Sequence, residues 1–380
     1  MKKLFTLILS VIVFFGNAQE ANKNLTSNAT SIPPGYYNTA TGTGYVLKTQ
    51  LSTIITNNYI DRGYSGLYTT YNTSDKDFYY ENDGTMLDMY TENPTGPECE
   101  FTYGINQDDG TLGNNECERY NREHTVPQSY FGNGIQPMYS DAHFVVPSDK
   151  YVNAQRGDYP YGKVNVASNT YTNGSKRGNN LNSGYSAGFT STVFEPIDEF
   201  KGDIARMLLY FSTRYETDLV NFYATSTSLV KVMFDGTSDH SFSPTFLNIL
   251  LTWNAQDPVS QREIDRNNAV YARQNNRNPY IDNNNYVTQV WGLPLATANF
   301  NYLNAIAVYP NPSNNGTVNI ASETTLDEID LITINGQILQ QIKNPAATNK
   351  TYTVSNLPQG FYFLKLSSNN ETVTKKVTIN

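Results

Sequence analysis

Residues Arg119–Phe131 read Arg-Tyr-Asn-Arg-Glu-His-Thr-Val-Pro-Gln-Ser-Tyr-Phe and contain one of the three histidines of this 380-residue chain. In this stretch His124 directly follows Glu123. A carboxylate next to an imidazole can hold a divalent cation and place a general base beside it. We therefore expect an extended segment, ending near Val126, that brings both side chains to one site.

The residues farther along predict the other two elements of a small β-β-α unit. Phe144–Pro147 is an apolar run that stops at proline, as the end of a strand does. Ser148 offers an N-cap and Asp149 a carboxylate in the first turn, so a helix is expected over residues 151–156. That helix carries Asn153. The pattern predicts a β-β-α arrangement around one metal ion.

Such a unit has the parts that hydrolysis of a phosphodiester requires. A neutral imidazole, with an ordinary pKa near 6.5, can take a proton from water at neutral pH. Mg²⁺ prefers oxygen ligands and keeps several waters, so one carboxylate and one amide oxygen suffice from the protein. His124 is the candidate base, and Glu123 and Asn153 are the candidate ligands. A Glu-His dipeptide is common, so a purely structural role is the alternative.

The first residues have the pattern of an export signal. Met1-Lys2-Lys3 precedes an apolar run over residues 4–15 and then Gly16-Asn17-Ala18, which predicts a signal peptide over residues 1–18. Residues 19–31, mostly Asn, Thr, Ser and Ala, predict a flexible leader. No later segment approaches the roughly 20 apolar residues of a transmembrane helix. We expect an exported protein without a stable membrane span.

The two cysteines agree with export. Cys99 and Cys117 flank a stretch rich in Gly and Asn, and a disulfide between them is expected in an oxidising compartment. Such a bridge would stabilise the fold by roughly 3 kcal/mol in the chain-entropy model. Metal ligation is the alternative, but a zinc site would need a second pair of ligands.

The charge of the chain is acidic. The formal net charge is −9, and loss of Lys2 and Lys3 with the signal makes it −11. Taken alone, this charge argues against a nucleic-acid partner, because phosphate binding normally leaves a basic footprint. A small cleft can still be locally basic, so the net charge speaks to solubility rather than mechanism.

Local patterns predict an α+β domain over residues 32–292. Helical periodicity predicts long helices over residues 44–56, 201–217 and 258–274. Residues 75–102 are aromatic and turn-rich, which predicts loops and brief strands. Residues 162–188, rich in Asn, Ser, Gly and Tyr, predict a long loop.

The composition changes after this domain. Residues 293–304 predict a linker, and residues 305–380 predict a small all-β sandwich. The expected strands, separated by turns bearing Asn, Gly and Pro, are residues 306–309, 317–320, 331–334, 352–354, 361–366 and 373–379.

Four ordered blocks resemble the bacterial endonuclease I family, secreted nucleases of the His-Me finger or ββα-metal class. The resemblance covers residues 32–292. The blocks are residues 121–129 around the Glu-His pair; residues 140–143 and 147–156; residues 194–206; and residues 257–260 with Glu263, Arg266-Asn267 and residues 274–282.

This resemblance implies His124 as general base, Glu123 and Asn153 as metal ligands, and dependence on Mg²⁺, with Mn²⁺ or Ca²⁺ as other candidate ions. It also implies DNA, and RNA as a further candidate, as a substrate cut with little sequence preference to 5′-phosphorylated products. Arg156, one helical turn beyond Asn153, is expected to contact a phosphate, with a plain surface arginine as the alternative.

Further residues have less definite expected roles. Candidate cleft contacts are Arg122, Arg266, Asn276 and Arg277, and for the last three the alternative is to tie the closing helix to the core. A structural role is favoured for Glu263, packing for His143, and a surface position for His240. Asn275 stands where the family usually has glycine, so the geometry of that turn is open.

The C-terminal residues resemble the type A sorting domain of the type IX secretion system. The resemblance rests on residues 308–312, 334–337 and 357–362. It implies the type IX secretion machinery as a partner, and release or surface attachment in a Bacteroidetes-type bacterium. A carbohydrate- or cell-wall-binding module is the alternative.

Together these features predict a secreted, monomeric, metal-dependent and largely non-specific endonuclease. Two rival functions are a non-catalytic adhesin on a nuclease-like scaffold and a phosphodiesterase acting on small esters. The adhesin predicts loss of Glu123, His124 or Asn153, and all three are present.

Overall fold

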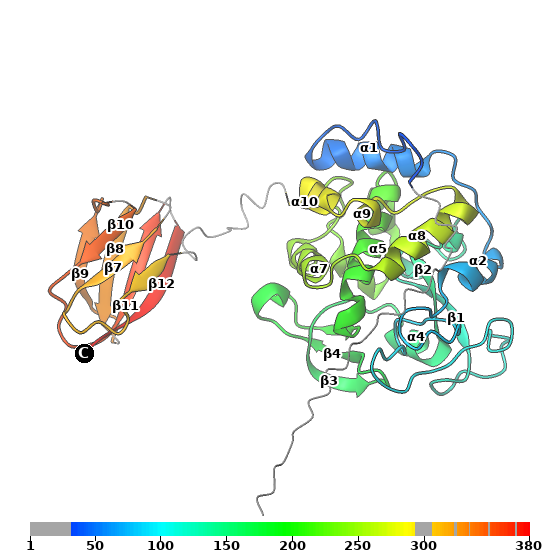
Figure 1. Cartoon of the computed structure of the whole chain (residues 1–380), viewed down its shortest axis with the longest axis horizontal. Helices are drawn as coiled ribbons and strands as arrows, with labels where there is room; N and C mark the ends of the chain where they lie inside the picture. The colour runs from blue at the N-terminus through cyan, green and yellow to red at the C-terminus, as the bar shows by residue number, and fades with distance from the viewer. Residues whose placement is uncertain (1–31, 293–305, 323–324, 334, 349, 369–370) are drawn as a thin grey trace, which may run out of the picture.

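The computed structural model describes residues 32–292, 306–322, 325–333, 335–348, 350–368 and 371–380 (Figure 1). The expected signal peptide, leader and linker lie outside these residues, so their bounds stay predictions. The described residues form two hydrophobic cores, one within residues 47–291 and the other within residues 306–379.

The first part combines helices with two small antiparallel sheets, β1-β2 and β3-β4-β5. Its helices are α1 (Gly44–Thr56), α2 (Gly66–Ser74), α3 (Gln128–Phe131), α4 (Lys150–Arg156), α5 (Lys201–Arg214), α6 (Leu219–Thr225), α7 (Pro244–Gln256), α8 (Gln261–Gln274), α9 (Pro279–Asp282) and α10 (Asn285–Trp291). Its strands are β1 (Tyr120–His124), β2 (Val145–Asp149), β3 (Val164–Thr170), β4 (Lys176–Asn180) and β5 (Thr192–Glu195).

Helix α5 is the centre of this part, and every one of its residues is buried. It packs against α1, α7 and α9 (Figure 1). The apolar stripe of α1 explains its position, because Leu47, Leu51 and Ile55 recur at helical spacing and are fully buried. Among the described residues, no helix has the length and apolar character that crossing a membrane requires.

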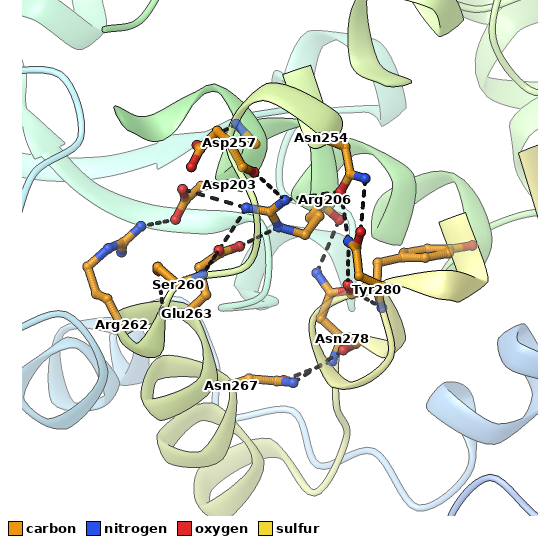
Figure 2. Close-up of polar contacts among 12 residues, drawn as sticks. Asp203, Arg206, Asn254, Asp257, Ser260, Arg262, Glu263, Asn267, Asn278 and Tyr280 are labelled. Atoms are coloured by element: carbon orange, nitrogen blue, oxygen red, sulfur yellow. Dashed lines mark hydrogen bonds and ion pairs between the residues drawn. The ribbon is translucent and has the colours of Figure 1, made fainter. Parts of the chain in front are cut away.

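A buried polar network holds α8 against α5 (Figure 2). The Arg206 guanidinium donates to both carboxylate oxygens of Glu263, over 2.6 and 2.7 Å, and to Asn254 Oδ1 over 3.0 Å. Glu263 also closes the capping box of α8 with Ser260. A buried charge of this kind is stable only when paired, so the structural role expected for Glu263 agrees with its position.

Several sequence expectations for this part need correction. Strand β2 runs through Pro147 to Asp149 instead of stopping at the proline, and the helix expected over residues 201–217 ends at Arg214. Residues 162–188 are not one long loop, because they contain β3 and β4. The N-cap of α4 is Asp149 rather than Ser148, because the Asp149 carboxylate accepts the Val152 N–H over 2.9 Å. The third expected helix begins at Gln261 rather than residue 258, after the Ser260 cap.

Strands β3 and β4 lack the burial pattern on which sequence prediction depends. Four consecutive residues of β3, from Asn165 to Ser168, are exposed. Gly178 on β4 lets the two backbones approach closely, because a Cβ there would lie 2.2 Å from the carbonyl oxygen of Val166. Backbone pairing, interrupted by irregular register, therefore carries this hairpin.

Residues 75–119 connect α2 to β1 and contain no helix or strand of their own, although all of them are described. The predicted disulfide between Cys99 and Cys117 is confirmed, and it closes part of this segment with the two Cα atoms 4.8 Å apart.

The C-terminal part is the expected β-sandwich. One antiparallel sheet has the order β10-β7-β6 and the other β12-β11-β8-β9. Side chains of both sheets share one core, including Ile320 from the first sheet and Leu364 from the second. The strands are β6 (Ala307–Tyr309), β7 (Val318–Ala321), β8 (Glu328–Thr333), β9 (Ile338–Lys343), β10 (Thr351–Val354), β11 (Gly360–Ser368) and β12 (Glu371–Ile379). Strand β9, which was not expected, is a largely exposed edge strand.

Candidate active site

The predicted β-β-α unit is present as β1, β2 and α4. Strands β1 and β2 are antiparallel, with Glu123 opposite Val146 and His124 opposite Val145. Helix α4 begins at Lys150, directly after β2, so the chain folds back and brings Asn153 beside β1. The Asp149 cap also accepts the Cys117 N–H over 2.7 Å, which ties the start of the helix to the disulfide.

This unit borders a cavity of about 360 Å³. The expected base, both expected metal ligands and two expected phosphate or cleft contacts all line it. The lining residues are Tyr64, Asn121, Arg122, Glu123, His124, Pro127, Gln128, Ser129, Asn153, Arg156, Gly157 and Asp158. The lining is strongly polar, which suits a charged substrate rather than an apolar one.

The His124 imidazole is held in one orientation. Its Nε2 lies 3.1 Å from the carbonyl oxygen of Tyr139. A carbonyl only accepts, so this contact assigns the proton to Nε2 and leaves the lone pair on Nδ1. Tyr139 and Tyr64 stack parallel to the ring, with centroids 5.7 and 6.0 Å away. Burial lowers the pKa of His124 to about 4, so the ring is neutral at pH 7.

Glu123 lies in a buried cluster of polar groups. The Tyr90 hydroxyl donates to Glu123 Oε1 over 2.8 Å, and Arg156 Nη1 donates to the same oxygen over 3.0 Å. Burial raises the pKa of Glu123, whereas the positive charge of Arg156 opposes that shift. Tyr161 completes the cluster, with its hydroxyl 2.5 Å from that of Tyr90 and its ring under the Arg156 guanidinium.

Arg156 is a buried linker between helix and strand. It also donates to the carbonyl oxygens of His124 and Thr125, over 3.0 and 2.8 Å, and it is fully buried. These bonds occupy both of its terminal nitrogens. The structure therefore places Arg156 as a residue that positions Glu123 and His124 rather than as a plain surface arginine, and its contact with a phosphate stays a prediction.

Asn153 is oriented by a neighbour on β1. Its Nδ2 donates to Asn121 Oδ1 over 2.8 Å, so its oxygen Oδ1 keeps its acceptor capacity. The cavity thus has a carboxylate, from Glu123, and an amide oxygen, from Asn153, on adjacent elements. Oxygen donors of this kind fit Mg²⁺, Mn²⁺ or Ca²⁺ better than a soft metal.

Arg122 is the cation best placed to meet a substrate. It lines the cavity and is partly exposed. Its guanidinium lies 3.5 Å from the ring centroid of Tyr64 and 4.4 Å from that of Tyr68, and Nη1 donates to the Tyr64 carbonyl. Stacking fixes the planar group without neutralising it, which suits a phosphate contact.

The other three expected cleft contacts do not line the cavity. Arg266 is buried against Asp75, with Nε 2.7 Å from Oδ1. Arg277 pairs with Asp282 over 2.6 Å, and the Asn276 amide donates to the Tyr210 hydroxyl. These side chains tie α8 and its following turn to the core, which was the alternative interpretation.

The remaining histidines lie away from the cavity. His143 is buried, and its Nε2 lies 2.9 Å from the carbonyl oxygen of Asn276, in agreement with a packing role. His240 is exposed at the surface beside Tyr45.

Sequence reasoning missed several residues around the site. Asn121 could have been found, because it lies two residues before Glu123 on the same strand and therefore on the same face. Tyr90 and Tyr161 could not have been found from local periodicity. Tyr90 bonds to Glu123 from 33 residues away, and Tyr161 bonds to Tyr90 from 71 residues away. The Tyr139 contact involves a backbone oxygen, which has no signature in the sequence.

Comparison with known proteins agrees with this geometry. Residues 43–285 match the model of the family described as Endonuclease I, and residues 307–380 match the secretion system C-terminal sorting domain. The chain therefore belongs to the endonuclease I family.

Two curated relatives match the same part of the chain. Both are named extracellular ribonuclease. The protein from Bacillus subtilis (strain 168) is 32% identical over 270 residues, covering 67% of this chain and 78% of the relative. The protein from Bacillus amyloliquefaciens is 29% identical over 262 residues, with the same two coverages.

A solved structure of PorZ, a surface component of the type IX secretion system of Porphyromonas gingivalis, matches 24% of this chain and 13% of that protein. The identity is 16% and the TM-score 0.18, which is too low to carry an argument.

These findings define a nuclease with a C-terminal sorting domain of the type IX secretion system, and they confirm both family resemblances. The protein acts on nucleic acid and is secreted or located at the cell surface. Its monomeric state stays a prediction.

Proposed function

We propose that this nuclease is a divalent-metal-dependent endonuclease that hydrolyses both DNA and RNA, with little sequence preference, to 5′-phosphorylated products. The observation that carries the proposal is the oriented His124 imidazole in the same cavity as the oxygens of Glu123 and Asn153. The names of the two relatives support RNA as a substrate beside DNA.

His124 acts as the general base in this proposal. Its Nδ1 takes a proton from water while Nε2–H remains bonded to the Tyr139 carbonyl, which disperses the positive charge that develops on the ring. The water oxygen forms a bond to phosphorus, and the bond from phosphorus to the 3′ oxygen breaks. The 3′ oxygen leaves with the electron pair and takes a proton from solvent, so the phosphate remains on the 5′ side.

Glu123 and Asn153 are the residues that would hold the metal, through a carboxylate oxygen and Oδ1. A bound divalent cation neutralises phosphate charge and stabilises the departing oxygen. Arg156 and Tyr90 keep the Glu123 carboxylate in place through Oε1, and Asn121 keeps the Asn153 amide in place. The protein therefore pre-organises its donors before either metal or substrate arrives.

The weak sequence preference follows from which groups the cavity offers. Arg122 is suited to a phosphate, and His124 acts on water at phosphorus. Contacts to phosphate position a nucleic acid but carry no sequence information, because the backbone is the same for every base. A cleft of this size admits the sugar-phosphate backbone of either nucleic acid.

The proposal is tested with purified protein, supercoiled plasmid DNA and a structureless RNA oligonucleotide. Both are expected to be cut in MgCl₂ and to stay intact in EDTA. Cut ends should accept ligation as 5′-phosphates without prior kinase treatment. His124→Ala should lower the rate by about 10²–10⁴, the usual contribution of a general base. His240→Ala, which changes an exposed histidine, should keep the full rate.

Intact plasmid and RNA in MgCl₂, or full activity of the His124→Ala protein, would contradict the proposal. A competition between DNA and bis(p-nitrophenyl) phosphate separates it from the small-ester phosphodiesterase. We expect DNA to suppress cleavage of the small ester, and cleavage of the ester in preference to DNA would favour the rival.

A further inference from the structure

A second group of carboxylates lies in the turn-rich segment between α2 and β1. Carboxylate oxygens of Asp77, Glu81 and Glu98 all lie within 4.8 Å of one another. The residues that line the catalytic cavity include none of the three. Like charges at such separations repel, so the arrangement needs a compensating proton or cation.

Glu92 is the observation that points to a ligand. It is only 1% exposed, and no N–H or hydroxyl group of the described residues donates to its carboxylate oxygens, which leaves the carboxyl group of Glu98 as its neighbour. Burial, together with the nearby carboxyl groups of Glu98, Asp77 and Glu81, raises the pKa of Glu92 to about 10. The carboxyl group of Glu92 therefore borders the group of three through Glu98, and the charges of Asp77 and Glu81 oppose its ionisation.

Backbone N–H groups of Tyr79, Tyr80 and Asn82 donate to the Asp77 carboxylate, but no cationic side chain in the described part of the chain compensates the charge of the group. Within the described residues, no ion pair joins Asp77, Glu81, Glu92 or Glu98 to a lysine, arginine or histidine. A buried carboxylate without a partner costs several kcal/mol, so native proteins protonate it, pair it or bind a metal to it.

We propose that Asp77, Glu81, Glu92 and Glu98 form a structural Ca²⁺ site, separate from the catalytic cavity. Ca²⁺ takes six to eight oxygen ligands in flexible geometry, which four carboxylates and water supply. Mg²⁺ keeps most of its waters and is poorly suited to so many anionic groups at once. The competing explanation is a proton shared between Glu92 and Glu98.

The site has a structural consequence for the catalytic unit. Asp88 and Tyr90 lie between the proposed ligands in the sequence. Asp88 Oδ2 accepts the backbone N–H of Asp149, the cap of α4, over 2.7 Å, and the Tyr90 hydroxyl donates to Glu123. By cross-linking residues 77–98, the cation holds both contacts in place, so calcium is expected to stabilise the fold and not to take part in the chemistry.

The test measures calcium binding rather than nuclease activity. The full-length chain and its variants are titrated with Tb³⁺, whose luminescence nearby tyrosines sensitise, and Tb³⁺ is then displaced with CaCl₂. The melting temperature is measured in parallel in CaCl₂ and in EDTA. The Asn153→Ala protein removes a ligand of the catalytic site, so binding that it retains belongs to the acidic group.

We expect the wild type and Asn153→Ala to bind Ca²⁺ at this site, with the wild-type melting temperature about 5 °C or more higher at saturating calcium. Glu92→Gln and Glu98→Gln should each weaken binding at least tenfold and lose most of this increase. Glu100→Gln is the matched control, because Glu100 is exposed and lies only two residues from Glu98.

Equal calcium binding by the wild type, Glu92→Gln and Glu98→Gln would overturn the proposal, as would no binding by Asn153→Ala. A shared proton predicts instead that Glu98→Gln is as stable as the wild type or more stable, with or without calcium. If Glu92→Gln fails to fold, the partly exposed Glu98 still provides the decisive variant. Failure of calcium binding leaves the DNA and RNA cleavage assay unaffected, so the two proposals fail independently.

Discussion

Arg156 Nη1 lies 3.0 Å from Glu123 Oε1, and both side chains are almost completely excluded from solvent. The contact joins the last residue of α4 to the strand that carries the catalytic pair. Since Arg156 also bonds to the carbonyls of His124 and Thr125, one buried guanidinium sets the position of the whole Glu-His segment.

Replacing this arginine should therefore damage the fold before it affects substrate binding. Arg156→Met leaves the Glu123 carboxylate buried without its countercharge, and the free energy of unfolding should fall by about 3–5 kcal/mol. Urea denaturation measures the change. Arg119→Met is the control, because the Arg119–Asp109 pair is exposed on the Asp109 side and should contribute little to stability. A stable Arg156→Met protein with only a raised KM would instead restore the phosphate contact expected from the sequence.

Arg122 should behave in the opposite way, as a substrate contact with little effect on the fold. Arg122→Gln should weaken binding of DNA of every sequence. The negative slope of the logarithm of the association constant against the logarithm of the salt concentration should become smaller in magnitude by about one. Fluorescence anisotropy in EDTA measures binding without cleavage. Arg119→Gln, outside the cavity, is the matched variant and should keep the wild-type slope. An unchanged slope in Arg122→Gln would remove Arg122 from the phosphate contacts.

The sequence predicts the β-β-α unit well because its signals are local. Glu123 and His124 are adjacent, the apolar run Phe144–Pro147 marks the second strand, and Asn153 follows a capping residue within one helical turn. Each of these signals depends on residues close together in the chain. The three long helices were predicted for the same reason, since their apolar stripes recur every three or four residues.

The roles that the sequence left open depend on contacts between distant segments. Neither periodicity nor composition tells whether Arg156 faces a phosphate or the buried carboxylate of Glu123. The same holds for Arg266, whose partner Asp75 lies 191 residues away. The hairpin of β3 and β4 was missed for another reason, because exposed strands held by backbone pairing leave no alternation of apolar and polar residues.

The buried His143 should make stability depend on pH. Burial lowers its pKa to about 4 in the folded protein, from an ordinary value of 6.5. Between these values the unfolded chain binds a proton that the folded chain does not, so the stability contributed by neutral His143 is lost as pH falls.

The advantage of the wild type over His143→Gln should therefore shrink by about 2 kcal/mol between pH 7 and pH 5. Urea denaturation at the two pH values measures it, and the comparison cancels titrations that both proteins share. His240→Gln, at an exposed position, should follow the wild type at both. A constant difference between the wild type and His143→Gln would mean that His143 is protonated in the folded state as readily as in the unfolded chain.

Asn275 ends α8 in the left-handed conformation, with φ of 61°. Asparagine tolerates this conformation better than most residues, and here its Nδ2 also donates to the carbonyl oxygen of Asn58 over 3.0 Å.

Asn275→Ala keeps the backbone strain of a Cβ and loses that bond, so the free energy of unfolding should fall by about 1 kcal/mol or more. Asn275→Gly loses the bond but relieves the strain, so it should be more stable than Asn275→Ala. Ala272→Gly, at an exposed position in the last turn of the same helix, should show the reverse order, with glycine less stable than alanine by up to about 1 kcal/mol. Urea denaturation of the three variants decides the matter. If alanine is preferred at both positions, the left-handed cap does not control the stability of the α8 end.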